Sequence, residues 1–298
     1  MGDSMIDALD YKGKVCVVTG GADGPSKVIV EKLVALGAEV YALDIYECKV
    51  PGIKGYITCD LANSMDIDNA FNYLPKNIDA FFGVSELSGV KSGYVSTFNY
   101  NFMANKYIIE KFLRWRMPAG GAICLLGSTV GLNWQSYKAE QDLFVHAKSW
   151  DETANKLREL SEISPSYFAY VFSKRCLLQL VSEKVLEFGQ VGIRINTVVQ
   201  GFTNAGLLNE FYDLLGGQAE IFKNSKIDYK VARPENIADP CLFLNSPRAG
   251  FIVGAELPVD YGNYALSRIG EFKIFGNLPA TKKKVQLNEK RRIEKLNK

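Results

Sequence analysis

A tyrosine and a lysine near the middle of the chain, Tyr170 and Lys174, have the types and the spacing needed for proton transfer. They lie in an apolar-periodic stretch, residues 168–188, that predicts a helix, on which positions four apart share one face. An unperturbed tyrosine has a pKa of about 10, and a neighbouring cation lowers that pKa by favouring the phenolate. The pair is therefore a candidate general acid and base. Alone it is weak evidence, because the same spacing is common on solvated helices.

A glycine-rich turn near the N-terminus predicts a site for a dinucleotide. It contains Gly20, Gly24 and Pro25, and it joins a predicted buried strand, residues 14–19, to a helical pattern that includes Val28. Strand, glycine turn and helix in this order form the context of a dinucleotide-binding fingerprint. The glycines let the backbone approach a pyrophosphate, and the helix N-terminus presents N–H groups to it. Pro25 suits the first helical turn, where no backbone donor is needed.

Two carboxylates near this turn indicate which dinucleotide would bind. Asp44 ends a second predicted strand, residues 39–44, and stands 20 residues after Gly24. This is the spacing expected of an acid that accepts hydrogen bonds from ribose hydroxyls. Asp23 immediately precedes Gly24, on the same side. Two negative charges would repel a 2′-phosphate, so the predicted cofactor is NAD and not NADP. The alternative is that Asp44 belongs to an ordinary turn at a strand end.

Strand and helix patterns alternate along the rest of the chain. Further strands are predicted over residues 53–60, 78–83, 121–127 and 193–199, and helices over residues 64–73, 97–115 and 168–188. This alternation predicts right-handed crossovers between parallel strands. The expected fold is a single-domain, Rossmann-type α/β domain over residues 1–263, with a doubly wound parallel sheet and helices on both faces.

The carboxyl ends of the predicted strands carry further candidate residues, because ligands of open parallel sheets bind at that edge. Ser128 follows the fifth strand and is placed for chemistry. The helix over residues 97–115 brings Asn101 towards the sheet. Asp60 and Leu61 end the third strand, near where an adenine ring would lie.

Composition and charge exclude several classes of protein. The chain has 298 residues, of which 47% are hydrophobic, but no apolar run is long enough to span a membrane. Six scattered cysteines without a Cys-x-x-Cys pair, and no visible secretory signal, favour the cytoplasm and argue against a metal site. The lone histidine, His146, is expected to have a surface or packing role. Residues 264–298 carry ten Lys/Arg and three Glu, which leaves an acidic body unsuited to nucleic acid. This basic extension is expected to be a solvated tail.

Together these features resemble the short-chain dehydrogenase/reductase family in its single-domain form, over about residues 14–262. The residues that carry the resemblance are Thr19-Gly20-x-x-x-Gly24, Asp44, Asp60, Asn101, Ser128-x-x-Gly131, Tyr170-x-x-x-Lys174, and the closing Ile252-Val-Gly254 and Pro258-Val-Asp260.

The resemblance implies a role for each candidate residue. Tyr170 is the proton donor to a carbonyl, or the base for an alcohol, and Lys174 holds the nicotinamide ribose and tunes the tyrosine. Ser128 hydrogen-bonds the substrate oxygen, and Asn101 positions a water that relays protons through Lys174. Contacts to the dinucleotide are expected from Gly20, Asp23, Gly24, Pro25, Asp44, Asp60, Leu61, Val84, Tyr170, Lys174, Gly201 and Thr203.

Three positions depart from the family pattern. Ser26 replaces the third glycine of the turn, and it is small enough to keep the helix close to the strand. Glu86 replaces a glycine after the fourth strand, where it either crowds the ribose of the cofactor or points into solvent. Gln200 replaces a proline after the sixth strand. These changes bear on cofactor affinity more than on the chemistry.

Two segments are expected to decide the substrate. Residues 134–165 form an insertion before Tyr170 that walls the substrate pocket or covers a subunit-packing surface, and residues 204–231 predict an apolar lid of two short helices. The insertion resembles that of bacterial hydroxysteroid dehydrogenases and carbonyl reductases. The predicted function is NAD-dependent interconversion of a secondary alcohol and a ketone, on a hydroxysteroid or bile acid, by a homodimer or homotetramer. The alternatives are a reductase of another carbonyl (sugar, polyol or acyl ketone) and a non-catalytic NAD-binding protein.

Overall fold

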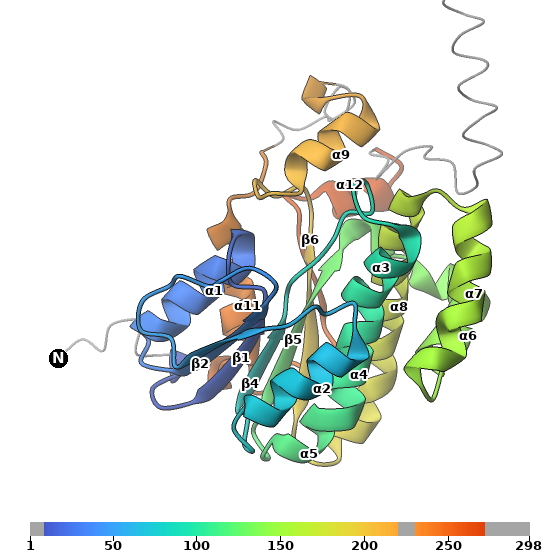
Figure 1. The fold of residues 1–298 in the computed structure, drawn as a ribbon. Helices are drawn as coiled ribbons and strands as arrows, with labels where there is room; N and C mark the ends of the chain where they lie inside the picture. The colour runs from blue at the N-terminus through green and yellow to red at the C-terminus, as the bar shows by residue number, and fades with distance from the viewer. Residues whose placement is uncertain (1–8, 220–229, 272–298) are drawn as a thin grey trace, which may run out of the picture.

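A seven-stranded parallel sheet forms the centre of the protein (Figure 1). The structure is a computed structural model that describes residues 9–219 and 230–271. The strands are β1 (Val15–Thr19), β2 (Glu39–Asp44), β3 (Gly55–Thr58), β4 (Ala80–Gly83), β5 (Ala122–Ser128), β6 (Arg194–Gln200) and β7 (Glu256–Val259), in the spatial order β3-β2-β1-β4-β5-β6-β7. The order reverses between β1 and β4, which opens a ligand crevice at their carboxyl ends. The predicted doubly wound, Rossmann-type fold is confirmed.

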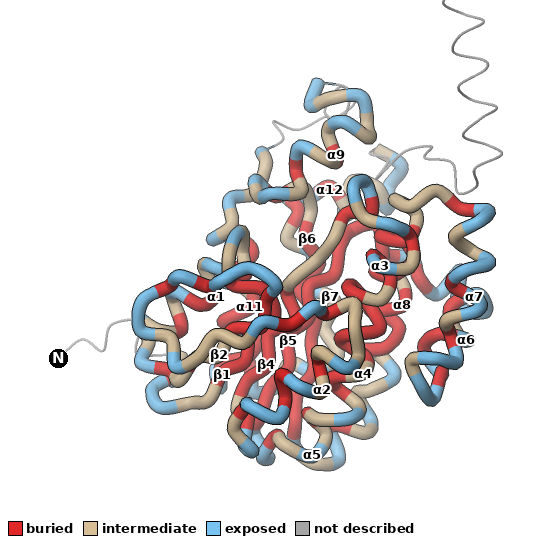
Figure 2. The backbone as a smooth tube through the Cα atoms, in the orientation of Figure 1, coloured by how far each residue is buried: buried red, intermediate tan, exposed pale blue. Residues whose placement is uncertain are grey.

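Helices cover both faces of the sheet (Figure 1). Their bounds are α1 (Gly24–Ala35), α2 (Ser64–Tyr73), α3 (Tyr94–Phe98), α4 (Ala104–Ile108), α5 (Arg114–Arg116), α6 (Lys138–Val145), α7 (Trp150–Ile163), α8 (Ser166–Gly189), α9 (Leu208–Leu215), α11 (Pro234–Asn245) and α12 (Asn263–Arg268). The inward-facing residues of α1 and α11 pack on one face of the sheet, and those of α2 to α4 and α8 pack on the other. Figure 2 shows the result as a buried sheet beneath largely exposed outer helix surfaces.

The strand residues alternate between these two cores, as a pleated strand requires. In β1, Val17 belongs to the core beneath α8, whereas Val18 belongs to the core beneath α1. Both faces are apolar, which explains why the sequences of β1 and β4 are almost continuously hydrophobic. β3 is shorter than the predicted strand because it lies at the edge of the sheet, where its residues are only partly buried.

The helix predicted over residues 97–115 continues in the structure from α3 to α5, but it contains two π-helical segments. They span Asn99–Met103 and Ile109–Leu113. A π segment changes the rotation of the residues beyond it and is often found at functional sites. Asn101 lies in the middle of the first segment and is buried.

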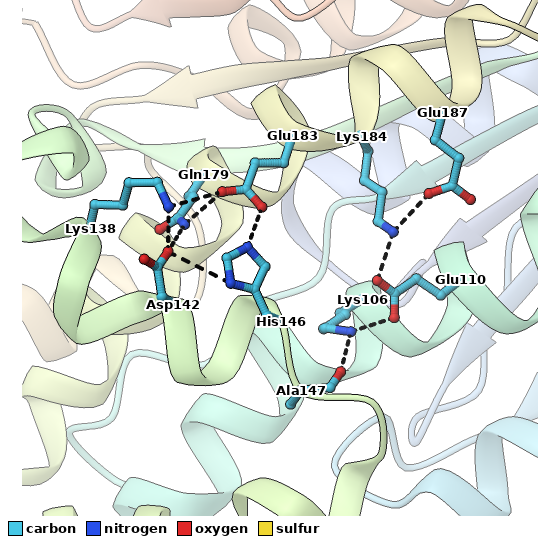
Figure 3. Close-up of polar contacts among 10 residues, drawn as sticks. All are labelled: Lys106, Glu110, Lys138, Asp142, His146, Ala147, Gln179, Glu183, Lys184 and Glu187. Atoms are coloured by element: carbon cyan, nitrogen blue, oxygen red, sulfur yellow. Dashed lines mark hydrogen bonds and ion pairs between the residues drawn. The ribbon is translucent and has the colours of Figure 1, made fainter.

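The insertion folds as α6 and α7, which lie outside α8 (Figure 1). Phe144 of α6 anchors it, because its ring meets Phe172 of α8 edge-on with centroids 5.2 Å apart. Polar contacts also join the segment of α6 to α8 (Figure 3): His146 Nε2 lies 2.8 Å from a Glu183 carboxylate oxygen, and the Gln179 amide donates to Asp142 at 2.6 Å.

Three of these side chains, Asp142, His146 and Glu183, place ligand atoms within 4.8 Å of one another. However, the Lys138 ammonium lies between the two carboxylates, 2.5 Å from Asp142 and 3.4 Å from Glu183. Since the lysine already compensates their charge, the group is an ion-pair network that joins two helices. His146 thus has the surface position that the sequence indicated.

Replacing Phe144 by alanine is expected to destabilise the protein by about 3–5 kcal/mol, the usual loss for a buried phenylalanine. The matched control is Leu143→Ala, one residue away, where the side chain is 46% exposed and the loss is expected to stay within about 0.5 kcal/mol. Urea unfolding followed by circular dichroism gives both values. Equal losses for the two variants would show that the insertion is not anchored through Phe144.

Candidate active site

A cleft of about 290 Å³ opens at the carboxyl ends of the central strands. Ten of the predicted site residues line it, namely Gly20, Asp23, Gly24, Pro25, Asp44, Val84, Ser128, Tyr170, Gly201 and Thr203. Asn101 and Lys174 lie behind its wall, and both are almost fully buried. Asp60 and Leu61 do not line the cleft: Asp60 is exposed and caps the following turn by accepting from the Ala62 N–H at 2.8 Å.

The glycine turn has the conformation that its sequence predicts. Gly20 and Gly24 have φ angles of +82° and +60°, which favour glycine. A Cβ on Gly20 would lie 2.7 Å from Ser26 Oγ. The Ser26 side chain therefore fits against the turn only because residue 20 is a glycine. The first turn of α1 therefore opens onto the cleft with its backbone N–H groups available to an anion.

The two predicted ribose carboxylates have different surroundings. Asp44 is buried and accepts from the N–H groups of Ala22 at 3.2 Å and Tyr46 at 3.1 Å, which ties the glycine turn to the end of β2. Asp23 points the other way, since its carboxylate would lie 3.2 Å from a Cβ placed on Gly206. Asp23 thus faces the loop that leads into α9.

Tyr170 and Lys174 project from α8 to the end of β5, where Ser128 lies. The Tyr170 and Lys174 side chains are both buried, and the Lys174 ammonium lies 5.3 Å from the centre of the Tyr170 ring. The ammonium donates to the carbonyl of Leu126 at 2.7 Å. The helix thus brings Tyr170 and Lys174 side by side, as their spacing predicts.

Glu86 points inward and forms an ion pair with Lys174, with Oε2 2.7 Å from Nζ. The Tyr170 hydroxyl lies 3.4 Å from the same oxygen. The other carboxylate oxygen accepts from the Gln200 amide at 2.6 Å, and the Gln200 carbonyl in turn accepts from the Thr203 hydroxyl at 3.1 Å. Of the two orientations considered for Glu86, the structure has the one directed into the site.

The contact between Glu86 and Gln200 was missed by reasoning from the sequence. Each residue replaces a smaller or more rigid family residue at the carboxyl end of a strand, β4 for one and β6 for the other. The sequence did contain a signal for this contact: both residues that differ from the family pattern follow strands whose carboxyl ends lie at the same edge of the sheet. Side chains at that edge are brought close together.

The backbone on both sides of Glu86 is fixed by side-chain hydrogen bonds. The Thr19 hydroxyl accepts from the N–H groups of Val84 at 3.0 Å and Ser85 at 3.3 Å. Asn101 clasps Leu87, accepting from its N–H at 2.8 Å and donating to its carbonyl at 2.9 Å. The amide of Asn101 therefore positions the loop that carries Glu86, a contact that the sequence did not indicate.

The environment of Tyr170 raises its pKa well above the ordinary value. Burial is the largest cause and the Glu86 charge is the next, while a hydrogen bond from Ser128 acts in the opposite direction. The sequence predicted that Lys174 would lower this pKa. That prediction is wrong for this arrangement, because burial of the phenol and the Glu86 carboxylate beside it both raise the pKa of Tyr170.

The helix α9 covers the site from above and forms one part of the predicted lid (Figure 1). Phe211 of α9 packs on the Tyr170 ring with centroids 5.1 Å apart. Glu210 binds the Ser88 hydroxyl and pairs with Lys91 at 3.2 Å, so the lid is tied to the loop that carries Glu86. Residues 220–229, on which the second lid helix was predicted, lie outside the described residues.

Comparisons with known proteins agree with this arrangement. Residues 159–263 match the family profile described as enoyl-(acyl carrier protein) reductase. Coniferyl-alcohol dehydrogenase of a Pseudomonas strain is 25% identical over 260 residues, which cover 85% of this chain and 98% of the relative.

Solved structures show the same fold. The 3-alpha-hydroxysteroid dehydrogenase from Pseudomonas sp., complexed with NADH, has a TM-score of 0.70 and 19% identity, and the match covers 86% of this chain and 99% of that one. A short chain dehydrogenase from Burkholderia cenocepacia, in complex with NADP, has a TM-score of 0.63 and 19% identity over 84% of this chain and 97% of that one.

A parallel sheet that carries a glycine turn and a Tyr–Lys pair at its carboxyl edge defines a nucleotide-dependent oxidoreductase class. In sequence and in fold the chain is similar to short-chain dehydrogenases. In the part of the chain that the structure describes, no helix has the length and apolar character needed to cross a membrane.

Replacing Glu86 by glutamine is expected to lower the pKa of Tyr170. The Glu86 carboxylate disfavours the phenolate, and the variant no longer carries this charge. The phenol of the variant should therefore ionise at a lower pH than that of the native chain. Tyrosinate absorbance measured against pH, with each protein compared with its own Tyr170→Phe counterpart, isolates this one phenol. Asp23→Asn is the control and should leave the Tyr170 titration unchanged. A variant that ionises at the same pH as the native chain would contradict the contact with Glu86.

Proposed function

We propose that the chain is an NAD-dependent oxidoreductase that interconverts a secondary alcohol and a ketone, with Tyr170 as the general acid and base. The observation that carries this proposal is the meeting of Ser128 and Tyr170 at the carboxyl edge of the sheet, beside a glycine turn and the Asp44 carboxylate. The Ser128 hydroxyl would bind the substrate oxygen, and the Tyr170 hydroxyl would exchange a proton with it. The bound nicotinamide supplies or accepts the hydride.

The residues present fit the adenosine half of the dinucleotide better than the nicotinamide half. The open first turn of α1 suits a pyrophosphate, and Asp44 is fixed at the end of β2, where it could accept from ribose hydroxyls. Gly20, Gly24, Pro25, Val84, Gly201 and Thr203 would line the bound dinucleotide. At the other end, the Lys174 ammonium that would hold the nicotinamide ribose is paired with Glu86.

The choice of NAD over NADP rests on charge. Asp23 and Asp44 both line the cleft near the glycine turn, where a 2′-phosphate would be repelled. The solved structures with this fold hold either NADH or NADP, so they do not favour one cofactor.

Replacing Asp44 by alanine is expected to weaken NADH binding and to narrow the preference for NADH over NADPH. One ribose hydrogen bond to a charged group is worth about 1.5–3 kcal/mol, which corresponds to roughly a tenfold to hundredfold loss. Quenching of protein fluorescence by each nucleotide measures both affinities. The control is Glu47→Ala, which removes an exposed carboxylate outside the cleft. Native NADPH binding tighter than NADH binding would contradict the assignment.

A hydroxysteroid or bile acid is the proposed substrate class. The part of the cleft next to Tyr170 is bounded by the apolar Phe202 and by Leu207 and Phe211 of the lid, which suit a large hydrophobic substrate. The fold neighbour that acts on a 3-alpha-hydroxysteroid supports this class. Another carbonyl substrate, such as a sugar, polyol or acyl ketone, remains the alternative. The ion pair on Lys174 favours a second candidate, a non-catalytic NAD-binding protein.

The proposal also covers the cellular location, the oligomeric state and the domain bounds of the protein. We place it in the cytoplasm, since the cysteines of the described residues are unpaired thiols. We also propose a homo-oligomer, a dimer or tetramer, because β7 is an edge strand that carries the exposed Leu257 and follows the exposed Phe251. Residues 1–263 would form the catalytic domain, and residues 264–298 a basic extension described only to residue 271.

Replacing Tyr170 by phenylalanine tests the function directly. Loss of the phenolic proton donor is expected to lower turnover of a hydroxysteroid by about 10²–10⁴-fold, the usual contribution of general acid–base catalysis. The fold should stay unchanged, because the ring and its packing on Phe211 remain. NADH absorbance follows the turnover. Near-native turnover in the variant would refute the role of Tyr170, and a native chain that binds NADH without any turnover on a broad alcohol and ketone panel would favour the non-catalytic candidate.

A further inference from the structure

We propose that Glu86 determines the affinity of this site for the nicotinamide half of a dinucleotide, by competing with the ribose for Lys174. The inference rests on the proposed function, in that it takes the cleft to be the dinucleotide site. Beyond that function, we infer that the Glu86 carboxylate must leave Lys174 before the nicotinamide riboside can enter. The adenosine half would bind without displacing it.

Glu86 lies in the space that hydride transfer to or from a substrate would require. The reacting carbon must carry an oxygen that touches the Tyr170 hydroxyl, and the nicotinamide ring must lie against that carbon. The carboxylate of Glu86 lies 3.4 Å from this hydroxyl and 2.7 Å from the Lys174 ammonium. The space next to Tyr170 and Lys174 that the ring and its ribose need is thus the space that Glu86 fills.

The ion pair is costly to break. The Lys174 side chain is 1% exposed and the Glu86 side chain 12% exposed, so neither charge is well solvated by water. A ribose hydroxyl that replaces the carboxylate would leave the buried ammonium with neutral partners only, the hydroxyl and the Leu126 carbonyl. A buried charge that loses its counter-ion is strongly destabilised. Part of the binding free energy of the nicotinamide half would therefore be spent on this exchange.

The surrounding contacts hold the carboxylate in place. Asn101 clasps the backbone of Leu87 and Thr19 holds Val84, so the loop cannot carry Glu86 away without losing buried hydrogen bonds. Displacement is left to rotation of the Glu86 side chain, which breaks the bond from Gln200. Since Gln200 also accepts from Thr203, the rotation would free a second polar group of the cleft.

The negative charge of the cleft would act on ligands differently from competition for Lys174. Three carboxylates line it, those of Asp23, Asp44 and Glu86, and no Lys or Arg of the described residues does. Repulsion from the cleft as a whole would weaken both halves of a dinucleotide, because ADP and NADH each carry the pyrophosphate. Competition for Lys174 would weaken only the ligand that has the nicotinamide ribose. ADP and NADH therefore separate the two effects.

The test is calorimetric titration of the full chain with ADP and with NADH, in the native form and with Glu86→Ala. We expect native ADP and NADH affinities within about threefold of each other, and an NADH affinity about tenfold or more higher in the variant, with ADP unchanged. Asp23→Ala is the matched control, since it removes a cleft carboxylate that faces Gly206. It should change the ADP and NADH affinities by the same factor.

Each outcome decides a different point. If the native chain binds ADP and the Glu86→Ala variant gains no NADH affinity, the competition is refuted while the proposed function stands. If neither ligand binds the native chain or the variant, the dinucleotide site itself is refuted, and the inference with it. If the loss of the buried counter-ion prevents Glu86→Ala from folding, Glu86→Gln takes its place: it keeps the side-chain volume, removes the charge, and should show about a threefold gain for NADH alone.

Discussion

The buried ion pair between Glu86 and Lys174 sets the electrostatics of the whole site. It compensates the Lys174 ammonium, and it places a negative charge 3.4 Å from the Tyr170 hydroxyl. Burial of the phenol and, next to it, the Glu86 charge give Tyr170 a raised pKa instead of a lowered one.

The fold brings this pair together from distant parts of the chain. Parallel strands end at one edge of the sheet, so the loops after β1, β4, β5 and β6 meet there, and α8 packs beside them. The π segment at Asn99–Met103 carries Asn101 to the backbone of Leu87, which fixes the loop around Glu86. The lid is tied to the same loop, because Glu210 of α9 contacts Ser88 and Lys91.

Much of the fold and the outline of the site could be predicted from the sequence. Hydrophobic periodicity and turn residues depend on positions close together in the sequence, so β2 and α2 have the predicted bounds. For the same reason, the spacing of Tyr170 and Lys174 correctly predicted that they lie on one helix face. Side-chain partners across the sheet are not local. The sequence could not show that Glu86 meets Gln200, whose position is 114 residues further along, or that Asn101 turns to Leu87 through a π segment. The predicted effect of Lys174 on Tyr170 failed for the same reason.

The most direct measurement of the central claim is a crystal structure of the full chain with NADH bound. We expect the Glu86 side chain to be rotated away from Lys174, the ammonium to bind the nicotinamide ribose hydroxyls, and the Asn101–Leu87 bonds to stay in place. A structure in which Glu86 still pairs with Lys174 while the nicotinamide lies against Tyr170 would contradict the account, because the carboxylate and the ribose would then not compete.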